Sequence, residues 1–336
     1  MIVRARAPVR IDFAGGWTDV PHFADREGGV VVSAALALHV HVECILGGAT
    51  IRLRAEDLDE HVTVSAAHAL RYDGTLDLHK AALNMLPVTG GIEILTRSEV
   101  PVGSGLGASG ALDVALVAAL AAARDEHYAA SELAELGYDV EATELGLEGG
   151  RQDQYAAAHG GWNELRVSAD GVEVRRIEAD RSAQRELGEL LVLAYTGQSH
   201  FSSQTHERVW SAYRDEQPDV VDALRTMRDL AKDAAAALRA GDWPRLGKLM
   251  DANWTEQRRL DATMATPAVR TVEEALRAAG VLGLKATGAG AGGCLAALTV
   301  NARDARRAAE AAGARVLEVA FDMDGVRVTR DEDARG

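Results

Sequence analysis

The chain has 336 residues, with 36 lysines and arginines against 51 aspartates and glutamates, and a formal net charge of −15. Its 47% apolar and 26% charged residues are typical of a folded globular protein and exclude a wholly disordered chain. The acidic balance argues against nucleic acid or an anionic membrane as the main partner. No signal peptide or membrane span is recognisable, and Cys44 and Cys294 are far apart, so we expect a cytoplasmic protein with two free thiols.

The N-terminal third of the chain predicts strands. Alternating or continuous apolar runs bounded by turn residues are typical of strands. They cover residues 2–13, 30–46, 51–53, 61–64 and 91–97. A helix is expected over 76–86 between the last two.

A glycine- and serine-rich loop begins at Pro101 and leads into residues 111–124, which are almost pure alanine, leucine and valine. A segment that is apolar on all sides predicts a buried helix. A second, amphipathic helix is expected over 131–145 with Ser131 as its N-cap. The glycine-punctuated segment 146–161 follows without a predicted element.

The second half is predicted to be mostly helical, with strands near 190–195 and 315–319 and on both sides of a glycine loop within 283–300. Helical periodicity covers residues 204–216, 219–240, 244–260, 267–279 and 302–312. The stretch 168–189 is polar and weakly patterned. We therefore expect two domains, 1–170 and 185–330.

The first candidate site is the loop PVGSGLGASG at 101–110, between a predicted strand and the buried helix. Glycines let several backbone N–H groups face one point, and a helix start adds unpaired donors and a positive dipole end. This predicts a phosphate site, with a flexible surface loop as the alternative. It is not a Walker loop, because no Lys-Ser/Thr follows the glycines. The candidate phosphate-binding residues are Gly103, Ser104, Gly105, Leu106, Gly107, Ala108 and Ser109.

Two other loops carry ligand-binding patterns. The glycines of 288–293 superficially resemble a dinucleotide fingerprint, but a strand is predicted after them, which favours a hairpin whose backbone approaches a ligand over a plain turn. In the loop 15–19, the Asp19 carboxylate can accept hydroxyl hydrogen bonds and the Trp17 indole can form an apolar wall. This suits a polyol, with an ordinary turn and a core tryptophan as the alternative.

Segments 7–19, 101–111 and 285–295 together resemble, in order and spacing, the three motifs of the GHMP kinase superfamily. The segment GRQDQYAA at 150–157 resembles the acidic segment of its sugar-kinase branch. The resemblance covers essentially the whole chain. It implies an α+β fold with an N-terminal lobe like the second domain of a small-subunit ribosomal protein and a ferredoxin-like C-terminal lobe.

The resemblance also implies transfer of the γ-phosphoryl group of ATP, with Mg²⁺, to the anomeric hydroxyl of a sugar. Asp153 matches the catalytic carboxylate and Arg10 the basic residue beside it. Ser109 and Glu141 match the metal ligands, with Glu144 as the rival of Glu141. The matched substrate-binding residues are Gly16, Trp17, Thr18, Asp19, Gly288 and Gly290.

The resemblance leaves the sugar open. The residues flanking Asp153 resemble kinases of D-glycero-D-manno-heptose 7-phosphate, whereas Trp17 and Pro21 resemble L-fucokinases, and His200 stands where the heptose kinases usually carry arginine. We expect the heptose 7-phosphate, with L-fucose or another unphosphorylated sugar as the alternative. A non-catalytic sensor of sugar and ATP and a Rossmann-type oxidoreductase are the competing classes. The expected partners are small molecules, and a homodimer is left open.

Overall fold

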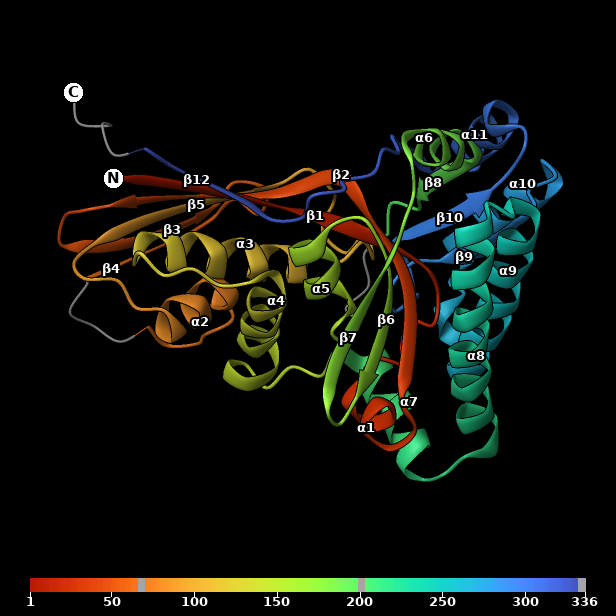
Figure 1. Ribbon diagram of the computed structural model, residues 1–336, viewed down its shortest axis with the longest axis horizontal. Coiled ribbons are helices and arrows are strands. Elements are labelled where there is room, and N and C mark those ends of the chain that lie inside the picture. Colours follow the sequence, from red (N-terminus) through yellow and green to blue (C-terminus); the bar gives the residue numbers. More distant parts are fainter. Residues whose placement is uncertain (66–69, 199–202, 332–336) are drawn as a thin grey trace.

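The computed structural model describes residues 1–65, 70–198 and 203–331, excluding the side chains of 203 and 204. The molecule is elongated, with a sheet-rich N-terminal lobe at one end and a helix-rich C-terminal lobe at the other (Figure 1). The long strand β1 (Ile2–Ala14) runs from the first lobe toward the second, and its antiparallel partner β2 (Gly29–Leu46) runs back from the second lobe into the first. Motifs carried on these strands are therefore placed between the lobes.

The N-terminal sheet has the order β12-β1-β2-β5-β3-β4, with β6 and β7 added beside the first part of β2. Residues 29–34 of β2 pair with β6, and residues 40–46 pair with β5. One strand can serve both neighbours because it is long and its first part is buried throughout. The other strands of this sheet are β3 (Thr50–Ala55), β4 (Glu60–Ser65), β5 (Ile92–Ser98), β6 (Trp162–Ser168), β7 (Gly171–Ile177) and β12 (Arg327–Asp331).

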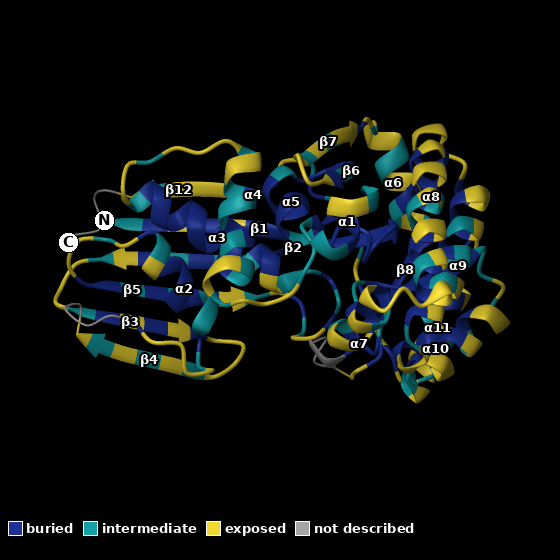
Figure 2. Ribbon diagram, turned by 90° about the horizontal axis from the view of Figure 1, so that it is seen from below, coloured by how far each residue is buried: buried dark blue, intermediate teal, exposed yellow. Residues whose placement is uncertain are grey.

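Helices cover one face of this sheet: α2 (Asp77–Met85), α3 (Ala108–Ala123), α4 (Ala130–Asp139) and α5 (Gln152–His159) (Figure 1). Helix α3 is buried along nearly its whole length (Figure 2). Its alanines allow the close approach of β1, β2 and the neighbouring helices. The predicted buried helix is confirmed, and it starts at Ala108 rather than Ala111.

The next helix differs from its prediction. It begins at Ala130, so Ala129 is the N-cap residue and Ser131 lies inside the first turn. The Glu132 carboxylate reaches back to accept the Ala129 N–H at 2.6 Å, which replaces the expected serine cap. The α-helix ends at Asp139 and continues as a π-helical turn, η1 (Val140–Glu144).

The C-terminal lobe contains an antiparallel sheet of order β11 (Arg315–Leu317), β8 (Leu191–Tyr195), β10 (Cys294–Leu298), β9 (Gly283–Ala286). Alternate residues of β8 enter two cores: Leu191 and Leu193 on one face, Val192 and Ala194 on the other. The helices of this lobe are α6 (Arg181–Leu190), α7 (Ser203–Arg214), α8 (Pro218–Ala240), α9 (Trp243–Leu260), α10 (Pro267–Ala278) and α11 (Ala302–Ala311).

Two regions depart from the expected domains. Residues 162–190 form β6, β7 and α6 instead of a weakly patterned connection, and β12 pairs with β1, with Ile2 opposite Asp331. Of the strand predicted near 315–319, only residues 315–317 join the small sheet. The division into domains 1–170 and 185–330 stays a proposal. Strand β12 belongs to the second range in sequence but pairs with β1 in the first sheet. In the described ranges, none of the helices combines the length and hydropathy needed to cross a membrane.

Candidate active site

The three glycine loops meet at one cavity of about 400 Å³ between the lobes. Its lining includes residues 103–105 and 107–109 of the second loop, Trp17 and Asp19 of the first, and Gly288 and Gly290 of the third. The third loop connects the antiparallel strands β9 and β10. The expected hairpin is therefore confirmed, and the Rossmann alternative, which needs a helix after this loop, is wrong.

The second loop presents backbone to the cavity. Gly103, Gly105 and Gly107 all have positive φ, and Gly107 is the left-handed N-cap residue of α3. The α3 N-terminus has no side-chain cap, so its first N–H groups are available to an anion. A Cβ atom added at Gly107 would lie 3.0–3.3 Å from the side chain of Asp153, so a larger residue there would push against Asp153.

Asp153 lies in the first turn of α5, and Arg10 reaches it from β1. The Arg10 guanidinium contacts Asp153 Oδ1 through Nη2 at 2.5 Å and Nε at 2.8 Å. Its Nη1 donates to the carbonyl of Gly105 at 2.6 Å. Arg10 is buried, whereas about a quarter of the Asp153 side chain is exposed to the cavity. The structure thus brings the predicted carboxylate, Asp153, into contact with the predicted basic residue, Arg10, and a hydrogen bond connects Arg10 to the glycine-rich loop.

Glu141 lies on the π-helical turn and lines the same cavity. Its Oε2 accepts a hydrogen bond from Gln154 Nε2 at 2.8 Å. Burial, followed by the nearby charge of Asp153, raises the pKa of Glu141 to about 7. Glu144 is exposed, accepts a hydrogen bond from the Tyr72 hydroxyl and does not line the cavity. The geometry therefore favours Glu141 over its rival.

A buried aspartate, Asp113 of α3, lies behind this end of the cavity. Burial raises the pKa of Asp113 well above its ordinary value, and the Glu141 and Asp153 charges raise it further. In the described part of the chain no three acidic, cysteine or histidine side chains form a complete metal cage. One accessible carboxylate in an acidic surrounding fits Mg²⁺, which takes few protein ligands and completes its shell with phosphates and water.

Trp17 is held in a strained conformation at the opposite end of the cavity. Its φ is 81°, a value rare for a bulky residue. The Thr18 hydroxyl fixes the turn by donating to the Gly15 carbonyl at 2.7 Å and contacting the Val30 carbonyl at 3.0 Å. A strained residue that lines a cavity suggests that its position matters for function.

Asp19 is fully buried beside this tryptophan, and its Oδ2 accepts the backbone N–H of Gln152 at 2.9 Å. Burial raises the pKa of Asp19 to about 6. Gly150 permits the contact, since a Cβ atom there would collide with the Asp19 carboxylate. Asp19 can thus accept hydrogen bonds from a ligand while its backbone partner fixes its position.

His206 of α7 completes this end, and nothing in the sequence pointed to it. Its ring centroid lies 4.4 Å from that of Trp17, and it lines the cavity. Trp17 Nε1, His206 Nδ1 and Gln152 Oε1 have no hydrogen-bond partner among the described residues. Burial lowers the pKa of His206, which favours the neutral ring. These polar atoms are suited to the hydroxyl groups of a ligand.

The remaining predicted residues occupy supporting positions. Gly16, Thr18 and Leu106 are buried and do not line the cavity, and His200 lies outside the described residues. A further part of the lining comes from β2, β3, the turn after β3, α2, β5 and the loop after β5, for which the sequence offered no motif. Its apolar residues are Val40, Ala55, Leu58, Leu78 and Val102.

Models of the GHMP kinases N-terminal domain and of the GHMP kinases C-terminal domain match residues 66–161 and 234–318, together more than half of the chain. The chain belongs to the GHMP kinase superfamily. It is an ATP-dependent kinase with the α+β fold of that superfamily, and the non-catalytic and oxidoreductase alternatives are set aside.

Three relatives of this GHMP kinase are informative. The D-glycero-alpha-D-manno-heptose 7-phosphate kinase of Campylobacter jejuni is 27% identical over 300 residues, 87% of each chain. The L-fucokinase/L-fucose-1-P guanylyltransferase of Bacteroides fragilis is 27% identical over 88% of this chain, which spans 34% of that relative's length. The crystal structure of a D-glycero-D-manno-heptose 1-phosphate kinase from Bacteroides thetaiotaomicron has a TM-score of 0.81 and 25% identity, covering 98% of this chain and 100% of the other.

Proposed function

We propose that this GHMP kinase transfers the γ-phosphoryl group of ATP to the anomeric hydroxyl of a sugar. The supporting observation is a single cavity with three adjoining parts. A backbone phosphate site and the Asp153–Arg10 pair adjoin a polar wall built around Trp17 and Asp19. A carboxylate beside an aromatic ring is suited to a polyhydroxylated ligand. The apolar lining from β2, β3, the turn after β3, α2 and the loop after β5 is the proposed position of the adenine ring.

In this proposal Asp153 accepts the proton of the attacking sugar hydroxyl as its oxygen bonds to the γ-phosphorus. The bond to the β–γ bridging oxygen breaks and ADP leaves. Arg10 keeps Asp153 ionised and offsets negative charge near the transferred group. The N–H groups at the start of α3 hold the phosphates, and Asp19 orients the sugar. Most of the rate enhancement then comes from positioning and electrostatics, as is general for phosphoryl transfer.

Ser109 and Glu141 would hold Mg²⁺ together with the ATP phosphates. Both line the cavity, and a hydrogen bond links their side chains. When bound, the ion supplies positive charge that neutralises the phosphates. The acidity around Glu141 is the observation that favours a cation at this position.

Two sugars are proposed in order. D-glycero-D-manno-heptose 7-phosphate comes first, because the Campylobacter jejuni relative matches over most of both chains. An unphosphorylated sugar such as L-fucose comes second. It is favoured by the two carboxylates, Asp19 and Glu148, that line the sugar end, because they would repel a second phosphate group.

The test is a coupled assay of ADP release with Mg·ATP against a panel of sugars: the heptose 7-phosphate, the unphosphorylated heptose, L-fucose, galactose and mannose. We expect ADP release with one sugar well above the rate without acceptor, and a product phosphorylated at the anomeric position by ³¹P NMR. A product phosphorylated elsewhere, or no acceptor among sugars and sugar phosphates, would contradict the proposal. A preference for L-fucose over the heptose phosphate would reverse the order of the two candidates.

A further inference from the structure

Asp12 of β1 and Lys285 of β9 form an ion pair in which both side chains are fully buried, with Lys285 Nζ 2.5 Å from Asp12 Oδ2. No other ion pair of the described residues has both partners so completely enclosed. The pair joins the first strand of the N-terminal sheet to an edge strand of the C-terminal sheet. Removing two charges from water is expensive, so such a pair is weak evidence for stability and invites another explanation.

The remaining hydrogen bonds of the pair lead to the third glycine loop. Asp12 Oδ1 accepts the backbone N–H of Gly288 at 3.0 Å, and Lys285 Nζ donates to the carbonyl of Ala286 at 2.7 Å. The Lys285 ammonium holds the pKa of Asp12 below its ordinary value, although burial alone would raise it. The pair is thus a charged anchor for residues 286–288.

The anchored loop presses against the phosphate loop. A Cβ atom added at Gly288 would lie 2.8 Å from the carbonyl oxygen of Gly105, and one added at Gly105 would lie 2.7 Å from that of Thr287. The same Gly105 carbonyl accepts a hydrogen bond from Arg10. Arg10 and Asp12 are two residues apart on β1, so contacts run in a closed ring from Asp12 through Gly288, Gly105 and Arg10 back to the same strand.

Charge alternates along this arrangement. Lys285 faces Asp12, and Arg10 faces Asp153, while Arg10 and Asp12 also interact electrostatically. Asp12 is therefore a potential competitor of Asp153 for the Arg10 guanidinium. Because Lys285 pairs with Asp12, the Arg10 guanidinium is free to pair with Asp153, the carboxylate that lines the cavity.

We propose that Lys285 is a positioning residue for phosphoryl transfer, because by neutralising Asp12 it reserves Arg10 for Asp153. Neither Lys285 nor Asp12 lines the cavity, so Lys285 acts through Asp12 and Arg10. The proposal does not depend on which sugar is bound, because Arg10 and Asp153 would take part in phosphoryl transfer to any acceptor.

The comparison of single and double variants separates this role from a structural one. Lys285→Met leaves Asp12 without its cation and free to draw Arg10 away from Asp153. Asp12→Asn leaves Lys285 without its anion but does not disturb the Arg10–Asp153 pair. The double variant removes both charges, and its introduced amide oxygen can still accept the Gly288 N–H. Because either single change leaves a buried charge unpaired, both should lower the melting temperature, and the double variant should recover most of the loss.

We expect kcat to follow a different order from stability. Lys285→Met should lower kcat about tenfold or more, part of what loss of the proton acceptor itself would cost. Asp12→Asn and the double variant should stay close to the parent kcat. A merely structural pair predicts the same kcat per folded molecule in both single variants. Equal losses in the two, or a parent-like kcat in Lys285→Met, would overturn the proposal.

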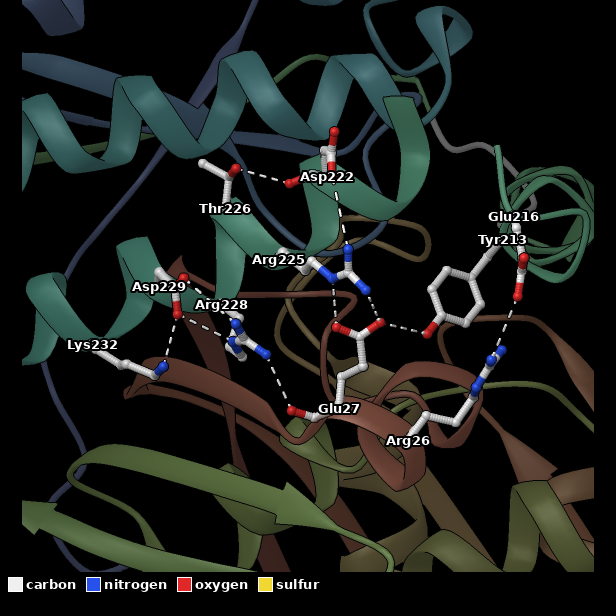
Figure 3. Close-up of polar contacts among 10 residues, drawn as sticks. All are labelled: Arg26, Glu27, Tyr213, Glu216, Asp222, Arg225, Thr226, Arg228, Asp229 and Lys232. Carbon is white, nitrogen blue, oxygen red and sulfur yellow. Dashed lines mark hydrogen bonds and ion pairs between the residues drawn. The ribbon is translucent and has the colours of Figure 1, made fainter. Parts of the chain in front are cut away.

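A second interlobe cluster supplies the control. Glu27 of α1 (Pro21–Glu27) accepts hydrogen bonds from Arg225 of α8 at 2.6 Å and from the Tyr213 hydroxyl at 3.3 Å (Figure 3). About half of the Arg225 side chain is exposed, and neither partner of this ion pair lines the cavity. Arg225→Met and Glu27→Gln should therefore change kcat and melting temperature little. A kcat loss in these variants as large as in Lys285→Met would also count against the proposal.

The measurement uses kcat divided by the fraction of folded protein, below the melting temperature of the weakest variant. If Lys285→Met does not fold, Lys285→Gln provides the uncharged comparison with a retained hydrogen-bond donor. If no sugar on the panel is a substrate, the same comparison is made with the slow hydrolysis of ATP, in which water is the acceptor. The positioning proposal can then be tested by ATP hydrolysis even if the proposal about the sugar fails.

Discussion

The two ends of the cavity are built by different means. The proposed phosphate end is backbone, supplied by residues 103–105 and 107–109, whose glycines adopt positive φ and touch neighbouring loops. The proposed sugar end consists of side chains brought from distant segments: Trp17, Asp19, Glu148 and His206. A site built from backbone has no side chains to vary, so substitutions can only obstruct its binding of phosphate. A wall built from side chains can be changed one residue at a time, and its specificity can change with it. Substitutions at the first end should therefore affect ATP or chemistry, and those at the second should affect the acceptor.

The largest effect is expected where the two ends meet, at Asp153. Asp153→Asn keeps the shape but removes the charge and basicity, so kcat should fall about 10²–10⁴-fold with little change in ATP affinity. Steady-state kinetics at saturating Mg·ATP, together with nucleotide binding by calorimetry, would test this. Glu144→Gln, at an exposed carboxylate outside the cavity, is the control and should resemble the parent. A near-parent kcat in Asp153→Asn would mean that the proton acceptor lies elsewhere.

Gly107→Val probes the phosphate end alone. It forces a side chain into a left-handed conformation and against Asp153, so ATP should bind about tenfold more weakly or worse. Gly146→Val is a matched control, because Gly146 also has positive φ but has no atoms near its added Cβ. Similar losses in the two variants would show that only backbone strain is measured. Tight ATP binding by a folded Gly107→Val protein would refute the phosphate-loop assignment.

Asp19→Asn probes the sugar end. It should raise the sugar KM about tenfold and leave kcat nearly unchanged, because the residue is proposed to bind hydroxyls rather than the reacting oxygen. Since the pKa of Asp19 is raised to about 6, the carboxylate is charged above that pH, and the parent's sugar KM should rise as the pH falls through 6. Asp19→Asn should lack this rise, and the exposed Asp25→Asn should keep it. A large loss of kcat in Asp19→Asn with an unchanged sugar KM would mean that Asp19 acts in the chemical step and not in sugar binding.

The smallest effect is expected on stability, at Glu141. Its pKa is raised from 4.5 to about 7, so the folded state releases this proton later than the unfolded state does. The folded protein is therefore penalised as the pH rises from about 4.5 to 7, by about 2 kcal/mol allowing for partial exposure. Without Mg²⁺, Glu141→Gln should raise the melting temperature by a few degrees at pH 8 and hardly at all at pH 4.5. A lower melting temperature at pH 8 would show that the carboxylate is compensated in the free protein.

Sequence alone predicted the loop and the helix of the proposed phosphate end well, because the determinants of these elements are local. Glycines before a long apolar run specify a turn and a buried helix, and the structure has both in α3. The same holds for the hairpin around residues 288–293 and for the strands with clear alternation. Arg10 and Asp153 belong to motifs that lie far apart in the sequence, and the structure brings the two side chains into contact.

The parts that sequence missed depend on tertiary contacts. Helix α5, which carries Asp153, has only eight residues and lacks an apolar stripe, so its periodicity is too weak to detect. His206 is an ordinary histidine on α7 until the fold brings it onto Trp17. Asp113 stands among alanines, leucines and valines, and this was the one available signal, a charge inside a segment predicted to be buried. The Asp12–Lys285 pair joins residues whose proximity no local pattern encodes.

The pairing of β1 with β12 has a consequence for biosynthesis. Residues 2–6 are made first, but their partners 327–331 leave the ribosome only after the whole C-terminal lobe has been translated. During that time the outer edge of β1 has unpaired backbone groups, the kind of edge on which nascent chains associate wrongly. The N-terminal sheet therefore completes its strand order only after the C-terminal lobe has been made. A ribosome-bound chain halted before residue 327 therefore leaves this edge of β1 unpaired, and we expect such a chain to need a chaperone.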